Sequence, residues 1–149
     1  MTSIFISHPN RELTATTIAH EYAQFIRKNS RFGVWLDTEH FPKSQILSEN
    51  KIKQILKEGF NKCGIFLGFY FPTDSVSRSR QDTWYKTEEN MAIYRNIPVI
   101  QVFLRGSKSS PHQRSYSKLY KFYYSKFSNW RSELLEKIKS IARLNKIPF

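Results

Sequence analysis

Apolar and polar positions divide the chain into short apolar runs separated by longer amphipathic stretches. Short apolar runs that stop at polar or proline residues are typical of buried strands. Five strands are expected: Ser3–His8, Val34–Leu36, Cys63–Phe69, Ile97–Leu104 and a short edge strand at Leu119–Tyr124. The third run is apolar throughout, as expected for a strand that is covered on both faces.

The amphipathic stretches repeat their apolar residues at helical spacing, which predicts helices with one buried face. The expected helices are a stretch around Ile18–Ile26 that ends near Asn29, a stretch from a Ser48 cap to Phe60, Trp84–Tyr94 and Trp130–Leu144. The last helix is expected to bury Trp130, Leu134, Ile138 and Ile141. Polar loops are expected at Pro72–Asp82 and Arg105–Lys118.

Strands and helices alternate along the chain, and this order predicts an α/β fold with a parallel sheet covered by helices on both faces. A chain of 149 residues can bury one core but is short for two. We therefore expect a single domain over residues 1–149. Within it, residues 105–149 form a basic C-terminal part with a loop, a short edge strand and a final helix.

Composition excludes several classes of protein. The chain is 40% apolar and 15% aromatic, which is typical of a folded protein. Its single cysteine, Cys63, excludes an internal disulfide framework and fits a reducing compartment. No secretory signal or membrane-spanning stretch is evident, so a cytoplasmic location without a membrane partner is expected. The four histidines lack metal-ligand spacing, so no metal site is expected.

The net charge of +12 is concentrated in the last third of the chain. Residues 105–149 contain eleven Lys and Arg against two Glu, a net +9. Such a charge attracts nucleic acid, acidic membranes, acidic partners or phosphorylated ligands. Solubility alone is the simpler explanation, because no run of basic residues is dense enough to form a binding arm. Nucleic acid is therefore not the expected partner.

Ligands of open parallel sheets bind beyond the carboxyl ends of the strands. Ser7 and His8 close the first predicted strand, and the loop Asp37–Leu47 follows the second. Trp84 and Glu88 are four residues apart and share one face of a helix. An aromatic ring beside a carboxylate suits a ligand with a planar ring and a sugar. Spacing alone favours a plainer interpretation, in which Trp84 anchors the core and Glu88 is solvated.

Several short motifs, taken in their order along the chain, favour the functional interpretation of Trp84 and Glu88. Between Ile4 and Leu104 the chain resembles a TIR (Toll/interleukin-1 receptor) domain. The resemblance rests on Phe5–His8, Val34–Asp37, Trp84-x-x-x-Glu88 and Asn96–Ile100. It implies a flavodoxin-like three-layer α/β/α fold with a mostly parallel five-stranded sheet. The part after Leu104 matches only loosely, as the family's last strand and helix.

Many TIR domains cleave NAD, and the resemblance implies that Glu88 is the catalytic residue. NAD would be the substrate, and no separate cofactor is expected. A carboxylate near the ribose can orient the sugar and stabilise positive charge that develops as nicotinamide leaves. Ser7, His8, Phe41 and Trp84 would contact the substrate. A loop-capping role for His8 and an anchoring role for Phe41 are equally compatible with the sequence.

A small stand-alone TIR protein of this kind resembles the signal-producing component of a bacterial anti-phage system such as Thoeris. The products would be nicotinamide and either ADP-ribose or a cyclic ADP-ribose signal, which a downstream effector would sense. The resemblance also implies a homo-oligomer assembled through TIR–TIR contacts.

The chain departs from the family's pattern beside the motif. The usual Cys after the Trp is Tyr85, and the usual Leu after the Glu is Glu89. Glu89 is therefore an alternative working acid. Adjacent helical residues point roughly a hundred degrees apart, so only one of the two acids is expected to face the site.

Two other functions remain open. The first is a non-catalytic TIR interaction module that assembles through Asp37–Leu47 and the basic surface. The second is nucleic-acid binding by the basic tail, which would weaken steeply with salt. A phospho-receiver domain shares the predicted fold, but it needs a pair of acids where this chain has Ser7 and His8.

Overall fold

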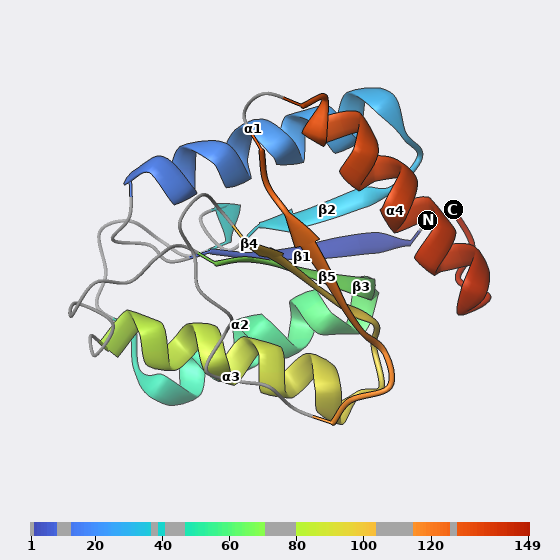
Figure 1. Ribbon diagram of the computed structural model, residues 1–149. Coiled ribbons are helices and arrows are strands. Elements are labelled where there is room, and N and C mark those ends of the chain that lie inside the picture. Colours follow the sequence, from blue (N-terminus) through green and yellow to red (C-terminus); the bar gives the residue numbers. More distant parts are fainter. Residues whose placement is uncertain are drawn as a thin grey trace.

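The computed structural model describes residues 2–8, 13–36, 39–40, 47–70, 80–103, 115–125 and 128–149, with the side chains of 13–15 and 80–86 left aside. Nine helices and strands lie in these ranges (Figure 1). In chain order they are β1 (Ser3–Ser7), α1 (Leu13–Asn29), β2 (Gly33–Leu36), α2 (Glu49–Lys62), β3 (Cys63–Tyr70), α3 (Arg80–Tyr94), β4 (Val99–Phe103), β5 (Leu119–Tyr123) and α4 (Trp130–Leu144).

The strands form one five-stranded sheet in the order β2-β1-β3-β4-β5, and every pairing is parallel. Helices α1 and α4 cover one face, and α2 and α3 cover the other (Figure 1). The predicted α/β class is confirmed, and the layers and strand order are those of a flavodoxin-like fold.

The alternation of side chains along β1 divides the core into two parts. Ile4 and Ile6 are fully buried in the cluster that includes the inner residues of α1 and α4. Phe5 points to the opposite face and is buried with residues of α2 and α3. The predicted inner face of α4 is confirmed, because Trp130, Leu134, Ile138 and Ile141 are all buried.

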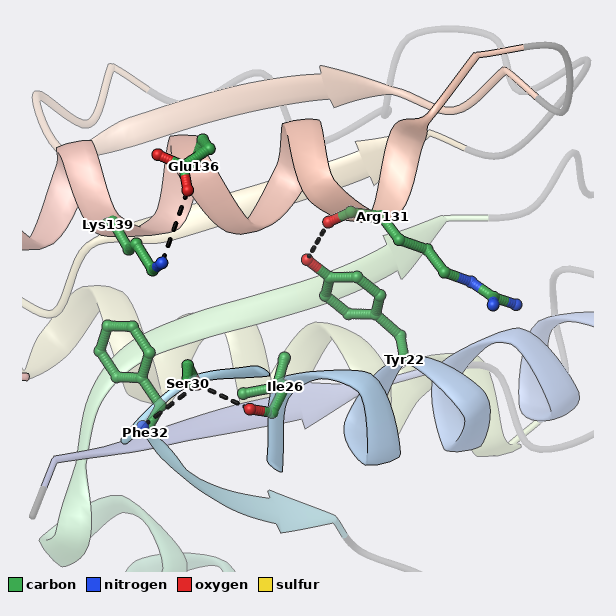
Figure 2. Close-up of polar contacts among 7 residues, drawn as sticks. All are labelled: Tyr22, Ile26, Ser30, Phe32, Arg131, Glu136 and Lys139. Carbon is green, nitrogen blue, oxygen red and sulfur yellow. Dashed lines mark hydrogen bonds and ion pairs between the residues drawn. The ribbon is translucent and has the colours of Figure 1, made fainter. Parts of the chain in front are cut away.

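A buried tyrosine joins α1 to α4 on the first face. The Tyr22 hydroxyl donates a hydrogen bond to the backbone carbonyl of Arg131 at 3.1 Å (Figure 2). Its ring stacks on Trp130 with a centroid distance of 5.2 Å. Burial raises the pKa of the Tyr22 phenol, because the phenolate would lose its hydration there.

A stack of aromatic rings fills the core under α2. Trp35 lies between Phe5, at a centroid distance of 4.4 Å, and His40, at 4.7 Å. Helix α2 approaches this stack through Gly59. A Cβ atom on Gly59 would lie 2.6 Å from Cε2 of Trp35, so a residue without a side chain is needed for this approach.

Several helix ends are closed by identifiable caps. The predicted cap at Ser48 is confirmed, since its hydroxyl accepts a hydrogen bond from the Lys51 amide at 3.2 Å. Helix α3 ends in a left-handed turn at Asn96, with φ of 59°, and Lys146 makes the same turn after α4, with φ of 56°. At Ser30 the side chain closes α1 by donating to the carbonyl of Ile26 and accepting from the Phe32 amide (Figure 2).

The expected start of α3 is wrong by four residues. The helix begins at Arg80 rather than Trp84, so the predicted loop Pro72–Asp82 overlaps its first turn. Residues 80–83 are all polar, and an apolar repeat therefore cannot reveal them as helical. The bounds of α4 are as predicted, whereas β4 is shorter than expected and begins at Val99.

Candidate functional site

Two predicted site residues meet at the end of β1. Ser7 lies on the same face as Phe5 because side chains alternate along a strand, and this face is covered by α3. The Ser7 hydroxyl donates a hydrogen bond to Oε2 of Glu88, which stands 81 positions further along the chain. Ser7 is fully buried and Glu88 is 5% exposed. The fold therefore brings together a carboxylate and a hydroxyl that the sequence places far apart.

The neighbouring acid is also buried against the sheet. Glu89 is 3% exposed, and its carboxylate accepts hydrogen bonds from the Tyr70 hydroxyl and from Nε2 of Gln101, the latter at 3.0 Å. The same Nε2 lies 3.3 Å from the Tyr70 hydroxyl oxygen. Both acids are thus buried against the sheet, although adjacent helical residues point roughly a hundred degrees apart. Both side chains are long enough to reach it from adjacent positions on the helix.

The strand register explains how both acids find polar partners. Ser7 is paired with Gly68 of β3, and Gly68 is paired with Gln101 of β4. All three residues lie on the face beneath α3. Because Gly68 has no side chain, the Ser7 hydroxyl and the Gln101 amide lie on either side of it with no side chain between them. Glu88 therefore bonds on the β1 side of β3, and Glu89 bonds on the β4 side.

His8 is buried, but it lies on the other side of the sheet from Glu88. Its Nδ1 is 3.4 Å from the Thr16 hydroxyl on α1, and its ring meets the edge of His20 at a centroid distance of 5.8 Å. The structure therefore brings Ser7 to Glu88 and directs the adjacent His8 toward α1.

The remaining predicted site residues are only partly described. The backbone of Trp84 belongs to α3, one turn before Glu88, while its side chain lies outside the described atoms. Phe41 lies outside the described residues, as does most of Asp37–Leu47. Glu39, His40 and Leu47 of that loop are described, and the first two contact the body of the domain. Glu39 pairs with Arg27 at 2.5 Å, and His40 stacks on Trp35.

A surface pocket of about 450 Å³ lies away from this site, at the opposite end of the sheet. It is lined by Thr2, Arg31, Pro148 and Phe149, so it lies beside the first residues of β1 and β2. Among the described residues, this lining contains no acid or nucleophilic side chain apart from the Thr2 hydroxyl. The chemistry of this lining gives no reason to place a reaction there.

Tyr70 and Gln101 were missed in the sequence. Tyr70 directly follows the predicted strand Cys63–Phe69, where a polar end is ordinary. Gln101 had a signal: it is an amide within an apolar run that is expected to be buried, and a buried amide requires hydrogen-bond partners. That requirement predicts a polar neighbour on the covering helix, and Glu89 is that neighbour.

Within the described ranges, no group of three or more His, Cys, Asp or Glu side chains is arranged to hold a metal ion. No helix in those ranges is long and apolar enough to cross a membrane. Comparison of the chain with models of protein families and with curated proteins found no match.

A buried carboxylate at the carboxyl edge of a parallel sheet can act in two ways. It can accept hydrogen bonds from the hydroxyls of a sugar, and it can stabilise a cation that forms close to it. The Ser7 hydroxyl turns about a single bond, so a ligand hydroxyl can share or replace its hydrogen bond to Glu88. The site is therefore suited to a ligand that is rich in hydroxyls and becomes positively charged during reaction.

Proposed function

We propose that the protein is an NAD-cleaving enzyme with a TIR-like site, in which Glu88 is the catalytic carboxylate. The observation that carries the proposal is the hydrogen bond between Ser7 and buried Glu88 at the carboxyl edge of a flavodoxin-like sheet. These residues belong to two of the sequence pieces that resemble the TIR family. Their meeting supports the resemblance, because it requires the two pieces to occupy neighbouring places in one site.

The proposed reaction breaks the bond between the nicotinamide nitrogen and the ribose. The bonding electron pair leaves with nicotinamide, which becomes neutral, and the ribose becomes an oxocarbenium-like cation. Glu88 would accept hydrogen bonds from the ribose hydroxyls and stabilise this charge. Water then captures the cation and loses a proton, which gives ADP-ribose. Capture by another nucleophilic atom of the same nucleotide gives a cyclic product.

Nicotinamide release from NAD by the purified protein tests this proposal. We expect wild-type protein at high concentration to release nicotinamide, and Glu88→Gln to lose at least about a hundredfold in rate, as removal of a transition-state contact does. The exposed Glu133→Gln on α4 is a matched control that should keep the wild-type rate. The product mass separates ADP-ribose from a cyclic form that is lighter by one water.

Absence of release from the wild type, also at crowding concentrations that favour self-association, would overturn the catalytic proposal. A non-catalytic interaction module is then the better account. The exposure of Tyr94, at 90%, and of Tyr123, at 65%, favours this second candidate, because aromatic side chains are common at protein interfaces. In that case Glu88 has a structural role beneath α3, and Tyr94→Ala would weaken self-association or partner binding.

Under the leading proposal the protein acts as a homo-oligomer in a bacterial anti-phage response, and its product is sensed by a downstream effector. Self-association with activity that rises faster than protein concentration would support this part. It is tested by sedimentation and by rate measurements over the same concentration range.

A further inference from the structure

We infer that Glu89 is a positioning residue: its hydrogen bonds to Tyr70 and Gln101 fix the turn of α3 that presents Glu88 to Ser7. The catalytic consequence rests on the proposed function. The positioning itself is a statement about the folded protein and can be tested without any reaction.

The first step of the argument is the rigidity of the groups that hold Glu89. Gln101 is fully buried within β4, and its Nε2 donates to Glu89 at 3.0 Å. The Tyr70 ring stacks on Phe103 at a centroid distance of 5.4 Å, which restricts the direction of its hydroxyl. The Ser7 hydroxyl that donates to Glu88 is not held by a ring or an amide plane and can turn about one bond. Glu89 is therefore held by two groups whose own directions are restricted.

The second step identifies the central group of the polar network that Tyr70, Glu89 and Gln101 form. Gln101 turns its nitrogen toward Glu89, while its Oε1 is buried without a hydrogen-bond partner among the described residues. An unpaired buried carbonyl costs free energy, so this amide orientation is stable only if the bond to the carboxylate compensates it. The carboxylate of Glu89 is thus the centre of the network.

The third step is the connection to Glu88. The two acids are consecutive residues of one helical turn, so a shift of that turn moves both carboxylates. The far end of α3 is held independently at the turn at Asn96, where Ala92 and Ile97 are buried in the core and the Ile97 amide bonds to the Ala92 carbonyl at 3.0 Å. With one end fixed by this turn, the bonds of Glu89 to β3 and β4 determine how α3 lies over the sheet. They thereby set the distance from Glu88 to Ser7.

If the network only stabilised the fold, variants that replace all its members would keep their activity. Removing one member of a buried polar network leaves its partners unsatisfied, but replacing all members by apolar side chains is often neutral or stabilising. The triple variant Tyr70→Phe/Glu89→Leu/Gln101→Leu should then be stable and keep its activity. If Glu89 positions Glu88, the triple variant should be stable and still have a reduced kcat.

Kinetics of nicotinamide release provide the first test. We expect Glu89→Leu to lower kcat by about tenfold to a hundredfold with KM nearly unchanged, the effect of a small displacement of a catalytic group. Glu89→Gln keeps a planar side chain that can bond to both Tyr70 and Gln101, and it should restore most of the lost kcat. Asn90→Ala, at an exposed position of the same helix, is the matched control. Normal kcat in Glu89→Leu or in the triple variant would overturn the inference.

A double-mutant cycle gives the test that needs no activity. Ser7→Ala, Glu89→Leu and the double variant are unfolded with urea, and the effect of Ser7→Ala on the unfolding equilibrium constant is compared in the two backgrounds. Residues that share no partner should give additive effects, whereas we expect a difference of about fivefold or more because Glu89 sets the contact of Glu88 with Ser7. Ser7→Ala combined with Tyr22→Phe, on the other face of the sheet, should be additive.

The two tests separate the two proposals. If the wild type releases no nicotinamide, the proposed function fails, and the cycle alone decides whether Glu89 positions Glu88. If Glu88→Gln abolishes release but the cycle is additive, the proposed function stands and the positioning inference fails.

Discussion

Ser7 and Glu88 share a buried hydrogen bond that ties the end of β1 to the middle of α3. This single contact joins the strand that begins the domain to the helix that carries two buried acids. Its energetic weight can be measured independently of any reaction.

Ser7→Ala is expected to lower the free energy of unfolding by about 1–3 kcal/mol, because it removes a buried donor to a carboxylate. Ser7→Thr retains the hydroxyl and should recover a large part of the loss. Urea unfolding at pH 7 measures both variants. Equal stability of Ser7→Ala and the wild type would show that Glu88 does not depend on this hydroxyl.

Gly59→Ala is expected to destabilise the protein although alanine is the better helix former. The gain in helix propensity is about 1 kcal/mol, but a Cβ 2.6 Å from Trp35 forces the aromatic stack to move. Overpacking of this kind costs about 1–3 kcal/mol, so a net loss should appear in urea unfolding. Asn61→Ala, at an exposed position of α2, should instead be neutral or stabilising. A stabilised Gly59→Ala would contradict the contact with Trp35.

Lys146→Gly is expected to stabilise the protein by about 1 kcal/mol, because Lys146 adopts a left-handed conformation that glycine enters without steric cost. The Lys146 and Ile147 amides both bond back to the last turn of α4, so the conformation is required by the cap. Ser140→Gly, within α4, should have the opposite sign. Thermal unfolding measures the two variants side by side, and a loss of stability in Lys146→Gly would refute this account of the cap.

Tyr22→Phe removes the hydrogen bond between α1 and the Arg131 carbonyl and keeps the ring. We expect it to cost about 1 kcal/mol of unfolding free energy, since one hydrogen bond between the two helices is lost. Tyr94 is 90% exposed, so Tyr94→Phe should have almost no effect. Equal stabilities of the two variants would indicate that this bond does not hold α4 in place.

Alkaline pH should destabilise the fold through Cys63. Burial raises the pKa of the Cys63 thiol from its ordinary 9.0 to about 12, so the folded state disfavours the thiolate. The thiol's contribution is therefore complete below pH 9 and is lost as the pH rises toward 12. Cys63→Ala should flatten this decline in urea midpoints measured between about pH 9 and 12. An identical decline in wild type and Cys63→Ala would assign it to other groups, such as Tyr22, whose pKa is also raised.

Much of the fold is predictable from the sequence because burial leaves a trace in the pattern of apolar residues. The short apolar run at Ser3–His8 and the helical spacing of Trp130, Leu134 and Ile138 identify a strand and a helix correctly. The same method fails at Arg80, where a helical turn built from polar residues carries no periodic signal.

The candidate site is predictable only in part. Ser7 is found through its place at the end of a strand and Glu88 through a resemblance, and the structure joins them. The bonds of Glu89 to Tyr70 and Gln101 are not found. The buried amide of Gln101 indicates that a polar partner is needed, but its neighbours depend on the register of two strands that are distant in sequence. A local pattern contains no information on such a register.

The order of the strands and helices along the chain has a consequence for folding during synthesis. Ser7, Tyr70 and Gln101, which bond to Glu88 and Glu89, are synthesised by the time β4 has left the ribosome. The apolar side chains of β4 that face α4, Ile100 and Val102, must wait for Trp130 and the helix that follows it. During this interval one face of the sheet lacks its second helix and is open to aggregation or to a chaperone. Slowing translation between the codons for β4 and α4 should therefore lower the yield of folded protein more than slowing it before β4.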